Sequence, residues 1–171
     1  LGDVVSNLKI RASYGSLGNQ NVPNYLYLSN IPINSNLPWI VDNQLPNYAG
    51  IPAVISPSLT WETVNTLDFG IDASFLRNRL EATFDWYKRN TLNMFGPSTI
   101  LPASLGTAPP QENNASLTTK GWEISIGWKD RINQDLNYSA RFTLADSRSY
   151  VTKYLNVTGL IDQFYEGKEL G

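Results

Sequence analysis

The sequence predicts an all-β fold: an antiparallel, up-and-down segment of a transmembrane β-barrel built from about five long strands. Three observations favour this fold. Apolar and polar residues alternate with a period of two over long stretches, which is typical of a strand with one apolar and one polar face. Long connections and short turns follow one another in strict alternation. Trp and Tyr residues gather near the ends of the apolar faces, as in the aromatic girdles of membrane barrels.

The clearest alternation lies in residues 67–86, LDFGIDASFLRNRLEATFDW. Apolar residues occupy odd positions before the sequence LRNR and even positions after it. This change of parity predicts a β-hairpin with an even-numbered turn and Arg77-Asn78 at its tip. A slip of one residue would move one whole apolar set to the other face. The predicted cross-strand pairs are Phe75–Leu80, Ala73–Ala82, Ile71–Phe84 and Phe69–Trp86.

The other strands are expected from the same alternation. Strands are predicted near residues 8–15, 61–76, 80–89, 120–129 and 136–145. Two long loops, 16–60 and 90–116, alternate with short turns near 77–79 and 130–135. In a meander this order places both long loops at one end of the sheet, which is the layout of outer-membrane barrels with long extracellular loops. Because the smallest membrane barrels have eight strands, the chain is expected to be part of a larger barrel.

Each face of the predicted sheet has its own residue types. The polar face is expected to line a water-filled lumen and carries Lys9, Arg11, Asp68, Asp72, Glu81, Asp85, Glu123 and Arg141. The girdle aromatics expected near strand ends are Tyr14, Trp61, Trp86, Trp122, Trp128 and Tyr138. Aromatic residues in the long loops are the candidate ligand-binding residues, since their rings could stack on sugars or line a peptide groove: Tyr25, Tyr27, Trp39, Tyr48 and Phe95.

Composition excludes several classes of function. The 171 residues carry a net charge of −2 and no basic patch, which argues against nucleic-acid binding. The absence of cysteine and histidine excludes disulfides, thiolate or imidazole metal sites, and Ser-His or Cys catalysis. No cofactor or metal is therefore expected, and the loop Asp and Asn residues lack the ordered spacing of a calcium site.

Two alternatives remain open at the level of pattern. A soluble β-sandwich, for example a carbohydrate-binding module, also has alternating strands, and it would fold alone in water. A β-rich glycoside hydrolase could use Asp68 and Asp72 as paired carboxylates. The second alternative is the weaker one, because nothing in the pattern shields these groups from water and so nothing would raise a pKa. We therefore expect no enzymatic activity.

Four segments together resemble one family. Residues 8–20, LKIRASYGSLGNQ, are similar to the LKxRxSYGxxGNQ stretch of the SusC/RagA-like TonB-linked outer-membrane transporters. Residues 61–63 (WET), 85–91 (DWYKRNT) and 120–123 (KGWE) resemble three further strand-end motifs of that family, in the same order. Four ordered motifs are more specific than any single one.

The resemblance implies a function that the alternation alone does not give. It implies a 22-stranded TonB-dependent receptor barrel in the outer membrane of a Bacteroidetes-type Gram-negative bacterium, with residues 1–171 as part of the barrel domain. It further implies import of oligosaccharides or peptides, a SusD-like surface lipoprotein as partner, and energy from the TonB complex. The plug and the TonB box that such transporters use have no counterpart in this sequence.

Overall fold

The computed structural model describes residues 4–19, 25, 27–97, 102, 104, 106–107, 109–156, 159 and 163–170. Its elements are the strands β1 (Val5–Asn19), β2 (Ile33–Asn34), β3 (Tyr48–Ala49), β4 (Glu62–Phe75), β5 (Leu80–Pro97), β6 (Gln111–Arg131), β7 (Asn137–Lys153) and β8 (Glu169–Leu170). Gln20, the last residue of the first family-like motif, lies outside the described residues.

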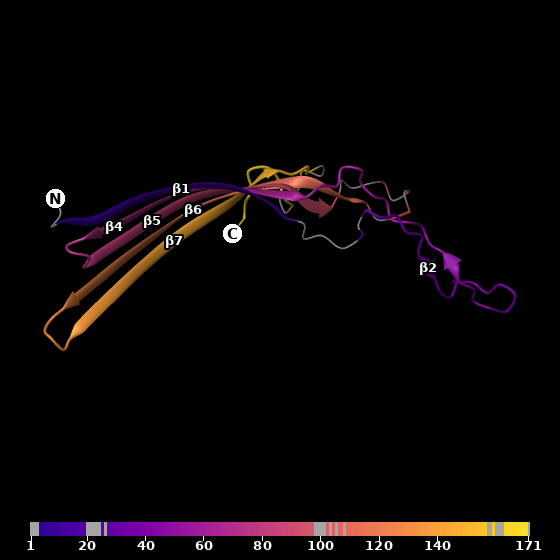
Figure 1. Cartoon of the computed structure of the whole chain (residues 1–171). Coiled ribbons are helices and arrows are strands. Elements are labelled where there is room, and N and C mark those ends of the chain that lie inside the picture. Colours follow the sequence, from indigo (N-terminus) through magenta and orange to yellow (C-terminus); the bar gives the residue numbers. More distant parts are fainter. Residues whose placement is uncertain are drawn as a thin grey trace.

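Six strands form one antiparallel sheet in the order β1-β4-β5-β6-β7-β8. The five long strands make a single curved layer, with the short turns at one end and the long connections at the other (Figure 1). The sheet is open, with β1 at one edge. An all-β antiparallel meander is therefore confirmed, and the sheet does not close on itself.

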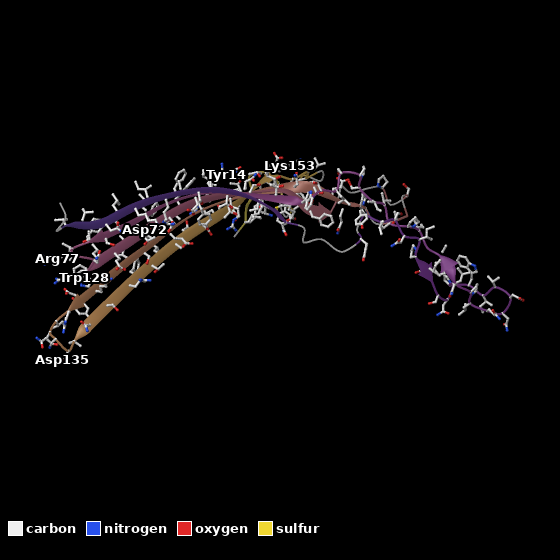
Figure 2. The ribbon with its side chains drawn as sticks, in the orientation of Figure 1. Tyr14, Asp72, Arg77, Trp128, Asp135 and Lys153 are labelled. Carbon is white, nitrogen blue, oxygen red and sulfur yellow. The ribbon has the colours of Figure 1, made fainter. Side chains whose placement is uncertain are left out.

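The register confirms the predicted hairpin. Phe75 lies opposite Leu80, Ile71 opposite Phe84, and Ala73 and Phe69 also face their expected partners. The turn between β4 and β5 is even-numbered and spans residues 76–79. Its first three residues, Leu76, Arg77 and Asn78, have positive φ, which reverses the chain within four residues. Arg77 lies at the tip of this turn, at the same end of the sheet as Asp135 (Figure 2).

No second layer covers the apolar face within the described residues. Phe69, Ile71 and Phe84 are 46%, 43% and 41% exposed, and Val151 alone among the described apolar side chains is buried. A β-sandwich would have sealed these residues against a facing sheet. The structure therefore rules out the sandwich arrangement for the described part. No described helix is long and apolar enough to cross a membrane.

The strands run further than the alternation predicts, and the loops are correspondingly shorter. β5 continues to Pro97 and β6 begins at Gln111, so the expected loop 90–116 shrinks to residues 98–110. β1 continues to Asn19 and β7 to Lys153, beyond the expected ends at 15 and 145. The physical reason is that ladder hydrogen bonds need no apolar side chains. At the loop end the strands are polar, as in QENNASLTT at 111–119, and alternation gives no signal there.

The expected loop 16–60 contains a hairpin of its own. Ile33 pairs with Ala49 and Asn34 with Tyr48, and further along Val41 and Gln44 exchange hydrogen bonds of 2.9 and 3.1 Å. The two residues between them, Asp42 and Asn43, have φ of 51° and 58°, as in the tight turns that suit hairpins. We call residues 32–50 the arm; it reaches away from the main sheet (Figure 1).

Candidate functional site

All eight charged residues expected on the polar face do share one face of the sheet. Cross-strand register places them in four adjacent rows across β1, β4, β5, β6 and β7. The rows are Ser13, Asp68, Tyr87, Gly121, Ser147; Arg11, Gly70, Asp85, Glu123, Ala145; Lys9, Asp72, Thr83, Ser125, Thr143; and Asn7, Ser74, Glu81, Gly127, Arg141. Whether this face lines a lumen stays a prediction.

Arg11 connects three strands on this face. Its guanidinium donates to both carboxylate oxygens of Asp72, at 2.8 and 3.1 Å, and to Asp85 Oδ1 at 2.8 Å. Asp85 is on β5, two strands and roughly 9.5 Å from β1, so the side chain must pass over β4. It does so at Gly70, where a Cβ atom would lie only 2.6 Å from Arg11 Cζ. The missing side chain at Gly70 therefore makes the three-strand ion pair possible.

A second glycine has the same role for an aromatic side chain. Tyr87 lies over Gly121, where a Cβ atom would be 2.5 Å from the phenol carbon and oxygen. A third, Gly127, separates Glu81 from Arg141 and lies in a shallow depression of about 240 Å³. Lys129 forms an ion pair with Glu81 at the rim of this depression. On the polar face, long side chains of one strand thus cross over glycines of a neighbouring strand.

Several charged groups on the described part of the polar face are held in ion pairs. Asp72 is held by Arg11 and is about one-third exposed at its side chain, so water and a permanent cation both keep it charged. Among the described residues, no three His, Cys, Asp or Glu side chains come close enough to hold a metal ion. The face offers hydrogen-bonding and charged groups to water and to polar molecules.

The candidate ligand-binding aromatics lie in three separate places. Trp39 and Tyr48 belong to the arm, Tyr25 and Tyr27 to the segment that leaves β1, and Phe95 to the outer part of β5. Tyr25, Tyr27 and Trp39 are 67%, 68% and 64% exposed. The described ring pairs, Phe69–Trp86 and Tyr154–Phe164, involve none of the five. Their role in binding stays a prediction.

A bulge lies in β5 near its end, just before the connection 98–110. The register of β5 and β6 shifts between Thr91 and Phe95, and Asn93 has a φ of 56°. Glu62 accepts a hydrogen bond from Phe95 N at 3.0 Å, and Asn113 donates to Asn93 O at 2.7 Å. These bonds satisfy the backbone groups that the bulge takes out of the ladder.

The same two side chains hold both ends of the loop that carries the arm. Glu62 accepts from Asn19 Nδ2 at 2.9 Å, at the end of β1. Asn113 accepts from Thr60 N and donates to Thr60 O, both at 2.8 Å. We call Glu62 and Asn113 the bulge clamp. It joins β1, β4, β5 and β6 at the point where the chain returns from the arm.

The apolar face forms a band of limited height. Its rows are Phe75, Leu80, Trp128, Ala140; Leu8, Ala73, Ala82, Ile126, Phe142; Ile10, Ile71, Phe84, Ile124, Leu144; and Ala12, Phe69, Trp86, Trp122, Asp146. Asp146, in the last row, is the charged exception within these rows and lies 3.7 Å from Arg148. Aromatic residues lie toward both ends: Trp128 donates to the Tyr138 hydroxyl at 3.2 Å near the short turns, and Phe69 stacks on Trp86 at 6.1 Å toward the loops. Charged residues, Asp130 and Lys120, follow on either side of the band along β6.

A family model described as "TonB dependent receptor-like, beta-barrel" matches residues 2–170. The chain belongs to this family. The match covers every strand of the sheet, and the long alternating strands, the tight turns at one end and the long connections at the other fit a segment of such a barrel wall.

Individual relatives agree with the family assignment. The chain is 31% identical over 151 residues to TonB-dependent receptor P3 of Formosa agariphila, covering 88% of this chain and 15% of that protein. It is 27% identical to TonB-dependent receptor SusC of Bacteroides thetaiotaomicron, covering 95% of this chain and 16% of SusC. The chain thus spans about a sixth of the length of these relatives.

Solved structures give the same result. The RagAB peptide transporter aligns with a TM-score of 0.72 and 26% identity, over 90% of this chain and 16% of that chain. The open-open state of the RagAB peptide importer aligns with a TM-score of 0.74 over 92% of this chain. The SusC/RagA-like resemblance is therefore confirmed.

The sequence analysis predicted neither the bulge clamp nor the two positions, Gly70 and Gly121, at which another side chain crosses directly over a glycine. We call these two positions the glycine seats. Gly70 and Gly121 occupy polar-face positions inside strands, where glycine otherwise weakens pairing, and that anomaly is a usable signal of close approach by another side chain. The clamp residues gave no such signal. Glu62 belongs to a recognised motif, but its partners Asn19 and Phe95 are distant in sequence.

The glycine seats can be tested by adding a methyl group. Gly70→Ala should displace the Arg11 guanidinium and break its bridge to Asp85, and Gly121→Ala should force Tyr87 into another rotamer. Each should lower stability by about 1–3 kcal/mol in the folded barrel. Gly127→Ala is the matched control on the same face, since its nearest neighbours would lie at 3.8 Å. Denaturant unfolding in detergent measures the effect. Equal stability of all three variants would contradict the assignment.

The bulge clamp can be tested by hydrogen exchange. Asn113→Ala removes three hydrogen bonds from the base of the loop, and the Thr60 amide loses its acceptor. Its exchange should accelerate about tenfold, the equivalent of one hydrogen bond. Asn137→Ala, an exposed position at the short-turn end of β7, should leave Thr60 unchanged. Unaltered exchange at Thr60 in Asn113→Ala would show that the clamp does not hold the loop.

Proposed function

We propose that this chain is a wall segment of a TonB-dependent importer in the outer membrane of a Gram-negative bacterium. In this role residues 1–171 are part of a receptor β-barrel domain, and further strands close the barrel around a passage for nutrients. One observation carries the proposal: five strands keep all their apolar rows on one face and all eight expected charged residues on the other, with no second layer of described residues. Such a sheet needs lipid on one side and water on the other.

The height of the apolar band supports a membrane location. Along β6 the charged residues that follow the band on either side, Lys120 and Asp130, are ten positions apart. At about 3.3 Å per residue this is roughly 33 Å along the strand. With the roughly 40° tilt of membrane strands, the height across the bilayer becomes about 25 Å, the usual height of the apolar band in outer-membrane barrels.

The proposed transport role assigns a task to each end of the sheet. The arm and the 98–110 connection lie at the long-loop end, which in such barrels faces outward. There Tyr25, Tyr27, Trp39, Tyr48 and Phe95 supply rings for an oligosaccharide or a peptide. Exposed apolar side chains on the arm, including Ile33 and Ile40 at 69% each, suit contact with a surface lipoprotein of the SusD kind.

We assign energy coupling and opening to segments other than residues 1–171. In the proposed importer the TonB complex acts through an N-terminal plug, and the polar face with Arg11, Asp72 and Asp85 borders the path that plug movement opens. The segment itself performs no chemistry. The likeness to SusC and to the RagAB peptide transporter supports import of oligosaccharides or peptides without choosing between them.

The orientation of the two faces is the decisive test. In the complete protein, a single cysteine carrying a fluorophore replaces either Ile124, on the apolar face, or its neighbour Glu123, on the polar face. Quenching by lipids with a nitroxide on the acyl chain should be strong at Ile124→Cys and at least fivefold weaker at Glu123→Cys, because contact quenching requires the label to lie in the bilayer. Equal quenching at both positions would overturn the proposal.

The role of the arm in ligand capture has a matched control. Trp39→Ala should weaken binding of the nutrient about tenfold, since one stacked aromatic ring contributes about 1 kcal/mol beyond its area. Trp61 is equally exposed, at 64%, and lies outside the arm, so Trp61→Ala should change affinity less than twofold. Calorimetric titration with peptides and oligosaccharides measures both. The arm has no part in capture if the two variants bind alike.

A further inference from the structure

The apolar face carries a row of three cations on adjacent strands. Register places Lys88 on β5 opposite Lys120 on β6, and Lys120 opposite Arg148 on β7. All three occupy the strand positions of the apolar face, one row further toward the loops than Trp86 and Trp122. We call Lys88, Lys120 and Arg148 the cation row.

Repulsion between the like charges of this row lowers the stability of the sheet. Directly opposite side chains in an antiparallel pair have Cβ atoms about 5 Å apart, and like charges at that separation repel. Within the described part of the chain, neither Lys88 nor Lys120 has a carboxylate within ion-pair distance. Arg148 approaches Asp146 at 3.7 Å and Glu169 at 3.8 Å, beyond hydrogen-bond distance, and its side chain is 61% exposed. Arg148 is thus partly neutralised, whereas the charges of Lys88 and Lys120 have no described carboxylate partner and leave the row positive.

The surroundings of the cation row suit a lipid headgroup. On the membrane side lie Trp86 and Trp122, whose amphipathic rings favour the headgroup level. On the outer side the next row contains Asn90, Thr118 and Tyr150, which are hydrogen-bonding residues; Thr118 donates to Asn90 at 2.9 Å. Long cationic side chains at this depth extend toward the membrane surface, where phosphate groups lie.

We propose that the cation row binds the phosphate of an anionic lipid headgroup in the leaflet at the long-loop end of the barrel. This inference rests on the proposed function, because it requires the apolar face to contact lipid. A phosphate brings up to two negative charges and several acceptor oxygens, which match two lysines and an arginine on neighbouring strands. A lipid, in contrast to free phosphate, also covers Trp86 and Trp122 with its acyl chains. The occupant is therefore a lipid and not a soluble anion.

The test measures lipid binding by the complete barrel in neutral detergent, with native mass spectrometry as the readout. The probes are lipid A, which carries phosphate, diglucosyl diacylglycerol, which carries none, and inorganic phosphate. The unaltered protein should retain lipid A and not the neutral glycolipid. Each cation near a membrane surface contributes about fivefold in affinity, so the triple variant K88Q/K120Q/R148Q should bind lipid A roughly a hundredfold more weakly.

A control variant removes one cation from each of the same three strands on the opposite face. Arg89, Lys129 and Arg141 occupy polar-face rows, so R89Q/K129Q/R141Q has the same change of net charge and should alter lipid A binding less than threefold. If the first triple variant does not fold, the single variants K88Q and K120Q should each lose about fivefold.

Four outcomes would overturn the inference. They are absence of lipid A binding to the unaltered protein, equal binding of the neutral glycolipid, equal losses in the two triple variants, and full displacement of lipid A by millimolar inorganic phosphate. The label at Ile124→Cys, measured in the same preparation, separates this inference from the proposed function. A label quenched by lipid together with no lipid A binding removes the inference only, whereas an unquenched label removes the proposed function as well.

Discussion

Backbone hydrogen bonds pair β1, β4, β5, β6 and β7 without a register shift from the row of Asn7 to the row of Leu17. Because side chains alternate between faces, this unbroken ladder decides the environment of every residue in the middle of the sheet. One inserted residue within a strand would turn its apolar side chains to the charged face beyond that point. The bulges lie outside this range, at the strand ends, between Val5 and Asn7, between Thr91 and Phe95, and between Ser116 and Leu117. There few residues follow the shift, so it inverts little of the sheet.

A single-layer sheet has no core, so its stability must come from elsewhere. Within the described residues Val151 is the one buried apolar side chain, and large residues such as Ile10 remain 74% exposed. The ladder satisfies the backbone groups between strands, and lipid would cover the apolar band in place of a second sheet. On the polar face, side-chain ion pairs connect neighbouring strands. Arg11 of β1 crosses β4 through the space over Gly70 and binds Asp72 of β4 and Asp85 of β5. Ion pairs as exposed as these add little to stability, so their main effect is to fix side-chain positions.

The sequence was sufficient to predict strand pairing wherever the two faces of the sheet differ in polarity. The change of parity around residues 76–79 predicted the pairing of Phe75 with Leu80 and of Phe69 with Trp86, and the structure has both pairs. Prediction failed beyond the apolar band, where residues 111–119 are mostly polar, without apolar alternation, and yet continue β6. It also missed the arm, because Pro and Asn interrupt its periodicity and the turn at Asp42-Asn43 is the one local sign of a hairpin. The bulge clamp could not be predicted at all, since Asn113 and Thr60 meet only after the sheet has formed.

The charged residues at the two ends of the apolar band differ in their ion-pair partners. Near the short turns, Asp130 accepts from Arg79 at 3.4 Å, and the Trp128 indole N–H donates to the Tyr138 hydroxyl, so the charged residue that follows the band there has a partner. Near the long loops, the cation row follows directly after Trp86 and Trp122, and within the described residues Arg148 alone of the three has carboxylates nearby. A sheet that needed only to span a symmetric bilayer would gain nothing from this difference. The asymmetry is expected when the two leaflets differ, because a boundary left positive is stabilised only where the facing headgroups are negative.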